Sequence, residues 1–173
     1  LRPEEFKNLQ SKLACMRMLC DTPYILDSEC RISPKLEELK KIFAELFVEP
    51  DPGTEPNKVI LFSEWTRMLE LIQAEAEQQG IEYALHTGAV HQKKRRLEIN
   101  RFKSDPACRL FLTSDAGATG LNLQAANIVI NVDLPWNPAK LEQRIARAWR
   151  KHQKRAVQVI NLVCENSIEH RIL

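Results

Sequence analysis

The segment LTSDAGATGLNLQAAN combines side chains and backbone that suit a phosphate ligand. Thr113 and Ser114 offer hydroxyl donors, and Gly117 and Gly120 permit the backbone to approach a ligand closely. Asn122 follows before a regular helix could lengthen. The segment therefore predicts a contact with a phosphate or a nucleotide. A tight, glycine-containing turn with a serine cap is the alternative that these residues leave open.

Three arginines recur every third residue in the segment LEQRIARAWRKHQ, at Arg144, Arg147 and Arg150. We expect them along one flank of a helix whose apolar side chains face the core, namely Leu141, Ile145, Ala148 and Trp149. Arginine suits a γ-phosphate because its planar guanidinium stays charged and stabilises negative charge spread over phosphoryl oxygens. A surface helix whose charges pair with neighbouring side chains is the alternative.

The sequence lacks the segments that would hold a triphosphate and its Mg²⁺. No GxxxxGK[ST] segment occurs in the 173 residues, and no acidic DExx box follows a strand-like run. We therefore expect that the chain does not hydrolyse ATP by itself. Because it begins with leucine instead of methionine, we also expect a fragment of a larger protein.

The composition is that of a globular protein, since 44% of the residues are hydrophobic and 28% are charged, which excludes a disordered or fibrous chain. The net charge is only +2, so a surface that binds nucleic acid must be local. The run at 93–96 is one candidate, although such runs are usually solvated helix faces. The five cysteines form no CxxC pair, which argues against a zinc site. Three of them lie in apolar stretches, which favours a reducing, intracellular compartment. No apolar run reaches 18 residues, so we expect no membrane span. We expect the fragment to be a monomer.

Short apolar runs alternate with helical patterns in the second part of the chain, which is typical of a parallel sheet covered on both faces. We expect strands at 59–62, 81–86, 109–113, 128–132 and 157–163. Helical patterns at 3–20 and 34–47 precede a proline-rich loop at 49–57. The prediction is an α/β fold: a three-layer α/β/α domain at 58–173 with a mainly parallel sheet, and a helical lead-in at 1–48 packed on it.

Ligands of such sheets gather at the carboxyl ends of the strands, in the loops that follow them. We therefore expect the functional side chains at Ser63-Glu64, at Thr87-Gly88, from Ser114 to Asn122, and from Leu134 to Asn137.

Taken in order, these segments resemble the second RecA-like lobe of the Swi/Snf-type ATPases of helicase superfamily 2. LACMRMLCDTPYIL and SPKLEELKKIF resemble the lead-in helices of that family, and KVILFSEW resembles its motif IV. YALHTG with RRLEINRF resembles the segment that follows. LFLTSDAGATGLNLQAANIVINVDLPWNP resembles motif V with its extension, and LEQRIARAWRKHQKRAVQVINLV resembles motif VI. The resemblance therefore covers nearly the whole chain.

The resemblance implies an ATP-dependent translocase of double-stranded DNA, whose first, N-terminal RecA-like lobe binds most of the ATP and Mg²⁺. Arg147 and Arg150 match the arginine fingers that reach the ATP on that lobe. The positions that match nucleotide contacts, or that couple the nucleotide to the cleft, are Gly120, Asn122, Gln143 and Arg144. The positions that match contacts with the DNA backbone are Ser63, Thr87, Gly88, Thr113, Ser114, Trp136 and Asn137, although Trp136 could instead be packing.

The sequence departs from the family pattern RAHRIGQ, because Trp149 replaces the histidine and His152 replaces the glycine. These departures put the turn after Arg150 in doubt. The phrase DLPWNPAKLEQRI resembles prokaryotic members, which favours a cytoplasmic, nucleoid-associated setting over a nuclear one. Two alternatives stay open: a superfamily 2 RNA helicase lobe, and a degenerate lobe that only binds nucleic acid or protein.

Overall fold

The computed structural model of the protein describes residues 2–118, 120–151 and 153–172. A sheet of five strands lies at its centre, and every strand pair in it is parallel. The strand order is β2-β3-β1-β4-β5. The strands are β1 (Val59–Phe62), β2 (Tyr83–His86), β3 (Leu110–Thr113), β4 (Ile128–Asn131) and β5 (Gln158–Asn161). The predicted parallel sheet is confirmed, and each strand lies within its expected range.

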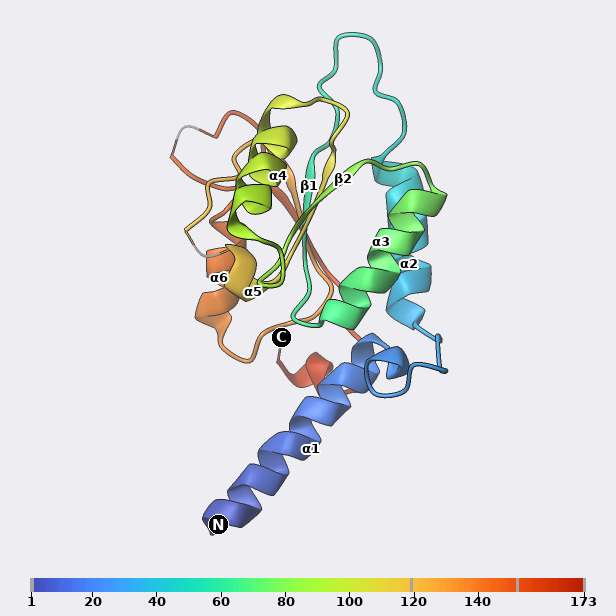
Figure 1. The fold of residues 1–173 in the computed structure, drawn as a ribbon, viewed down its shortest axis with the longest axis vertical. Coiled ribbons are helices and arrows are strands. Elements are labelled where there is room, and N and C mark those ends of the chain that lie inside the picture. The colour runs from blue at the N-terminus through green and yellow to red at the C-terminus, as the bar shows by residue number, and fades with distance from the viewer. Residues whose placement is uncertain (1, 119, 152, 173) are drawn as a thin grey trace.

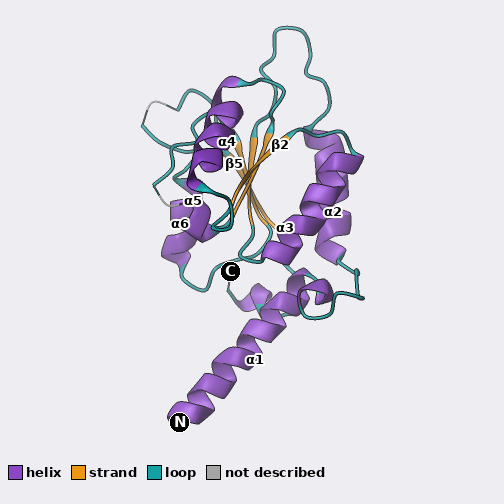
Figure 2. Cartoon of the chain, viewed as in Figure 1, coloured by secondary structure: helices purple, strands orange, loops and turns teal. Residues whose placement is uncertain are grey.

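Helices cover both faces of this sheet, as Figures 1 and 2 show. On one face lie α2 (Pro34–Leu46) and α3 (Thr66–Gln78). On the other face lie α4 (Gln92–Ser104), the short α5 (Asp115–Ala118) and α6 (Pro138–Ile145). The expected three-layer α/β/α architecture is therefore confirmed.

The apolar runs of the strands are continuous because both faces of the sheet are buried. In β1, Val59 and Leu61 belong to the cluster beneath α2 and α3, whereas Ile60 and Phe62 belong to the cluster beneath α4. All four side chains are fully buried. Successive residues of a strand point to opposite faces, so each face receives every second residue of the same run.

The helical lead-in has two parts. α2 begins at Pro34, where the predicted pattern begins, and the Ser33 side chain caps it by accepting a hydrogen bond from the amide of Leu36. Its apolar face packs on the sheet. α1 (Pro3–Asp21) instead extends away from the body of the molecule, and its buried residues are Arg17 and Asp21 in its C-terminal turns. Two 3₁₀ turns, at Pro23–Ile25 and Glu169–Arg171, complete the described elements.

The helix predicted through Trp149 ends at Ile145, which corrects the expected arrangement of the three arginines. After it, the amides of Arg147 and Ala148 bond carbonyls three residues back, as in a tightened turn. The carbonyl of Arg147 accepts from the amide of Leu123 at 2.9 Å, so it is not used to continue the helix. Trp149, expected in the core, is 64% exposed.

Candidate nucleotide cleft

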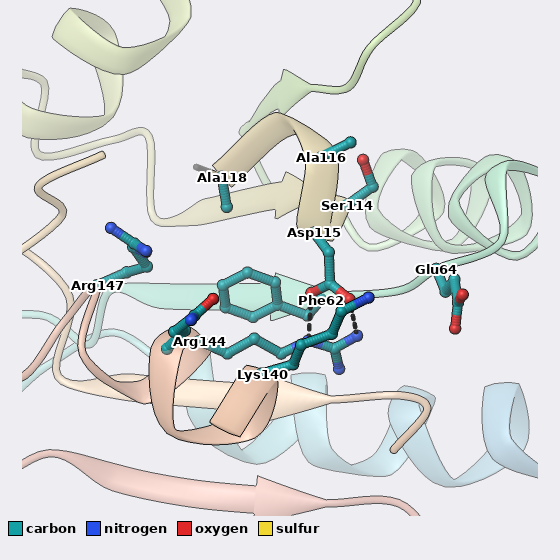
Figure 3. Close-up of a pocket in the computed structure, with 10 residues that line it drawn as sticks. Phe62, Glu64, Ser114, Asp115, Ala116, Ala118, Lys140, Arg144 and Arg147 are labelled. Carbon is teal, nitrogen blue, oxygen red and sulfur yellow. Dashed lines mark hydrogen bonds and ion pairs between the residues drawn. The ribbon is translucent and has the colours of Figure 1, made fainter. Parts of the chain in front are cut away.

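A cleft of about 430 Å³ opens at the carboxyl ends of β1 and β3, between α5 and α6. Figure 3 shows side chains from these elements converging on it. Four of the residues that the family resemblance matches to functional positions line this cleft together: Ser114, Gln143, Arg144 and Arg147. The other lining residues are Phe62, Glu64, Asp115, Ala116, Ala118 and Lys140.

Arg144 lies beneath the cleft floor and is 2% exposed. Its guanidinium bonds Asp115 at 2.6 and 3.0 Å and Asp133 at 3.1 Å, and it donates to the carbonyl of Asp133 at 2.7 Å. Burial alone would lower the pKa of Arg144, but the two carboxylates outweigh burial and raise that pKa above its ordinary value. Arg144 is therefore a fixed structural cation, and the expected exposed position on a helix flank is wrong.

The two aspartates extend this network across three strand ends. Asp115 follows β3, and its partly exposed carboxylate faces the cleft. Asp133 follows β4 and is 1% exposed. Asp133 also accepts hydrogen bonds from the Ser63 hydroxyl at 3.0 Å and the Glu64 amide at 2.8 Å. The arginine thus fixes α6 to the ends of β1, β3 and β4.

Arg147 differs from Arg144 in that its charge remains available. It is half-buried and lines the cleft, where it donates to the carbonyl of Leu121 at 3.4 Å. Among the described residues it has no acidic partner within ion-pair distance. Lys140, exposed in the first turn of α6, likewise has no ion pair within the described part of the chain. The cleft therefore presents two cations that could meet an anionic ligand.

Three predicted nucleotide or finger residues lie outside the cleft lining. Arg150 is exposed and donates to the carbonyl of Ala146 at 3.4 Å. Asn122 is exposed, and its side chain accepts from the amide of Gln124. Gly120 has a φ of +75°, and a Cβ built on it would meet no atom within 4 Å, so backbone conformation and not close approach favours glycine there.

Close packing requires a glycine at the position of Gly117. A Cβ at this position would collide with the carbonyl oxygen of His86, where α5 lies against the end of β2. The Ser114 hydroxyl accepts from the Gly117 amide at 3.4 Å. The turn alternative raised from the sequence thus describes the local role of these residues, while Ser114 still lines the cleft.

The structure corrects the predictions that Ser63 and Thr113 contact DNA. Both are fully buried. The Thr113 hydroxyl donates to the carbonyl of His86 at 2.7 Å, and the Ser63 hydroxyl donates to Asp133. Neither hydroxyl is open to a phosphate, because each is used inside the protein to join neighbouring strand ends.

The turn that contains Thr87 and Gly88 follows β2 at the same edge of the sheet. Thr87 is 6% exposed, whereas Gly88 is exposed. Arg95 holds the turn by donating to the carbonyls of Gly88 at 2.9 Å and Val90 at 2.5 Å. This positioning role of Arg95 is hidden in the sequence, where it is one of four consecutive basic residues.

Trp136 and Asn137 lie in the segment between β4 and α6. Asn137 is the N-cap of α6, since its side chain accepts from the amide of Ala139 at 3.0 Å. Trp136 is 49% exposed, and its ring centroid lies 5.7 Å from the guanidinium carbon of Arg17. His152, the second departure from the family pattern, lies outside the described residues.

Asp115 and Asp133 hold Arg144; the sequence placed Asp115 in a predicted segment but gave it no role, and Asp133 was missed. A usable signal existed: each carboxylate comes two residues after a strand, at the sheet edge where ligands gather. Sequence reasoning also missed Lys140 and Arg17, for which spacing gives no signal.

A second buried charge cluster surrounds Lys35. Its ammonium bonds Asp21 at 2.6 Å and Glu169 at 2.8 Å. Cys20, Cys164 and Glu169 are close enough to hold a metal ion in principle. The Lys35 ammonium already occupies Glu169 and repels a second cation, so the cluster is structural.

No helix in the described residues is long and apolar enough to cross a membrane.

The comparison with a known protein family matches the part of the chain that forms the cleft. Residues 35–152 match the helicase conserved C-terminal domain. The chain belongs to this family. It is 42% identical over 120 residues to the DNA repair and recombination protein RAD54-like of Drosophila virilis, a match that covers 68% of this chain and 15% of that protein.

Solved structures agree with the fold. The C-terminal part of the Fun30 ATPase domain superposes with a TM-score of 0.72 at 30% identity, covering 81% of this chain and 44% of that one. The Sulfolobus solfataricus SWI2/SNF2 ATPase C-terminal domain superposes with a TM-score of 0.75 at 24% identity, covering 99% and 69%. At 24% identity, the second similarity is evidence for the fold alone. The helicase domain described here spans between 15% and 18% of the length of the curated relatives.

Proposed function

We propose that this helicase domain is the second motor lobe of an ATP-dependent translocase of double-stranded DNA. Arg147 carries the proposal, because its guanidinium lines a cleft at the ligand-binding edge of the sheet and has no acidic partner there among the described residues. In the assembled enzyme this cleft faces a triphosphate held on the first lobe. Arg147 then stabilises the negative charge that develops on the transferred phosphoryl group.

The residues of the cleft fit a phosphate better than they fit a metal ion. Lys140 and Arg147 are cations, and Ser114 is a hydroxyl donor. Asp115, whose carboxylate is also in the cleft, is bonded by Arg144 through both oxygens. Mg²⁺ therefore belongs with the absent lobe, where it would neutralise the phosphates. Within this chain, Arg144 keeps α6 in place so that Gln143 and Arg147 meet the nucleotide.

Contacts with DNA are proposed at the same edge of the sheet, from the turn at Thr87 and Gly88 and from Ser114. Gly88 and Ser114 are at least partly exposed there. Backbone and hydroxyl contacts of this kind reach phosphates without reading bases, so binding would be independent of sequence and sensitive to salt. Arg150, Trp136 and Asn137 would then border the nucleic acid or the first lobe.

The test is Arg147→Ala in the ATPase that contains both lobes. We expect ATP turnover to fall by about 10³-fold or more, as for loss of an arginine finger, while binding to duplex DNA is kept. Lys103→Ala, which removes an exposed cation of α4 outside the cleft, is the matched control and should leave turnover unchanged. Normal turnover in Arg147→Ala would refute the finger assignment.

The class of nucleic acid is tested in the same protein. Duplex DNA should stimulate ATP turnover more than RNA of equal length does. Stronger stimulation by RNA would instead favour an RNA helicase lobe. We also propose a prokaryotic, nucleoid-associated setting, which the segment DLPWNPAKLEQRI supports.

A further inference from the structure

Arg17 lies near the C-terminal end of α1 and is 5% exposed. It is a buried exception in a helix that is otherwise largely open to solvent and extends away from the sheet (Figure 1). Burying a guanidinium is costly unless it is paired, so its partners identify what the contact does.

The partners of Arg17 come from two strand ends. One of its terminal nitrogens donates to the Glu64 carboxylate at 2.8 Å and to the carbonyl of Leu134 at 3.0 Å. Its guanidinium carbon lies 5.9 Å from the ring centroid of Trp65 and 5.7 Å from that of Trp136. A single side chain therefore joins α1 to the segment after β1 and to the segment that leads into α6.

Glu64 is the partner that matters for the cleft. Its side chain is 38% exposed and lines the same cleft as Lys140 and Arg147. Figure 3 shows Glu64 on one side of the Asp115–Arg144 pair and Arg147 on the other. A free carboxylate at this place would repel an anionic nucleotide, and the repulsion would act across a partly desolvated space.

We propose that Arg17 is a positioning residue of the cleft, which neutralises Glu64 and fixes the approach to α6, so that α1 tunes the affinity of the cleft for a nucleoside triphosphate. This inference rests on the proposed function of the cleft. The proposed function gives α1 no role at the cleft. In this inference α1 changes the electrostatics of the cleft through the Arg17–Glu64 pair, although no residue of α1 lines the cleft.

The experiment uses four variants of the two-lobe ATPase: Arg17→Met, Arg17→Lys, Glu64→Gln, and Arg17→Met combined with Glu64→Gln. Arg17→Met leaves the carboxylate unpaired, so we expect KM for ATP to rise by about five- to tenfold, with a smaller change in kcat. The rise should shrink as salt is added. Adding Glu64→Gln to Arg17→Met removes the repelling charge and should return KM to within about twofold of the original value.

Glu64→Gln alone keeps the proposal testable if Arg17→Met folds poorly. Because this change leaves Arg17 charged and only removes an acidic group, KM should fall or stay constant. Arg17→Lys keeps the charge and should preserve most of the affinity. If Arg17 only holds α1 against the body of the protein, Glu64→Gln does not rescue Arg17→Met, and that outcome overturns the proposal. An unchanged KM in folded Arg17→Met, or a raised KM in Glu64→Gln, overturns it as well.

Failure of this inference can be separated from failure of the proposed function. If Arg147→Ala abolishes turnover but the Arg17 and Glu64 variants do not change KM as stated, the inference alone fails. If Arg147→Ala keeps normal turnover, the proposed function fails and the role of Arg17 at a nucleotide fails with it. Tryptophan fluorescence of the 173-residue chain, which should change in Arg17→Met because of Trp65 and Trp136, verifies the contact without ATP.

Discussion

Two buried clusters in this molecule each join one cationic side chain to two carboxyl groups, but their surroundings differ. In one, Arg144 bridges Asp115 and Asp133; in the other, Lys35 bridges Asp21 and Glu169. The Lys35 cluster is sealed, with side chains at most 4% exposed. The Arg144 cluster opens on one side, because the side chain of Asp115 is 24% exposed and lines the cleft.

The difference shows that a buried ion cluster does not by itself indicate a functional site. Removing one partner of either cluster leaves uncompensated charge in the interior, so both should matter for stability. Only the Arg144 cluster adjoins an accessible cleft with an available cation, Arg147. The comparison therefore predicts that one cluster affects stability and turnover together, while the other affects stability alone.

The largest effect is expected for Arg144→Met. It leaves the buried carboxylate of Asp133 without its cation and releases α6, so the free energy of unfolding should fall by about 3–5 kcal/mol. In the two-lobe ATPase, the protein that remains folded should lose ATP turnover, because Arg147 is no longer held in place. Denaturation measured on the chain and turnover per folded molecule provide the two readings. Full turnover in folded Arg144→Met would remove the distinction between the clusters.

A smaller overall effect is expected for Lys35→Met. The unfolding free energy should again fall by about 3–5 kcal/mol, because Asp21 and Glu169 lose their shared ammonium. ATP turnover per folded molecule should be retained, since Lys35 contacts no lining residue of the cleft. Adding Glu169→Gln removes the carboxylate that is left without its ammonium and should recover part of the lost stability. Loss of turnover in folded Lys35→Met would show that the sealed cluster also acts on the cleft.

The smallest effect concerns the pH dependence of the Lys35 cluster. Burial, together with the nearby charge of Asp133, raises the pKa of Asp21 to about 8 despite the opposing charge of Lys35. A carboxyl whose pKa is raised on folding stabilises the protein fully below its unfolded pKa of about 4, and that contribution is lost as pH rises toward 8.

Asp21→Asn cannot titrate, so its unfolding free energy should depend less on pH between about 4 and 8 than that of the original protein. Chemical denaturation at several pH values, compared between the two proteins, measures this difference. Equal pH dependence in both would mean that Asp21 is ionised in the folded protein throughout this range.

The strands and the α2 cap were predictable because their signals are local. A run such as Val59–Phe62 has to be buried on both faces, and Ser33 caps the helix that begins at the next residue by accepting from an amide three residues on. The end of α6 was not predictable in the same way. The apolar spacing continues to Trp149, but the carbonyl of Arg147 bonds Leu123, a residue from a distant loop.

The sequence predicted which residue types form the site, but it predicted the roles of those residues less well. Ser114, Gln143, Arg144 and Arg147 do meet in one cleft, which spacing and the position after strands suggested. Spacing could not reveal that Arg144 is buried, because its partners lie 29 and 11 residues away on other strand ends. The same holds for Thr113, whose hydroxyl is used by the backbone of β2.

The sequence by itself determined the parallel sheet, its covering helices and the presence of several arginines beyond the strand ends. It did so because hydrophobic periodicity and turn residues act within one element. Only the tertiary structure decided which arginine is fixed beneath the cleft, which one remains available, and that Arg17 of α1 reaches the cleft wall through Glu64. Those roles depend on burial and on charges from distant segments, which no local pattern records.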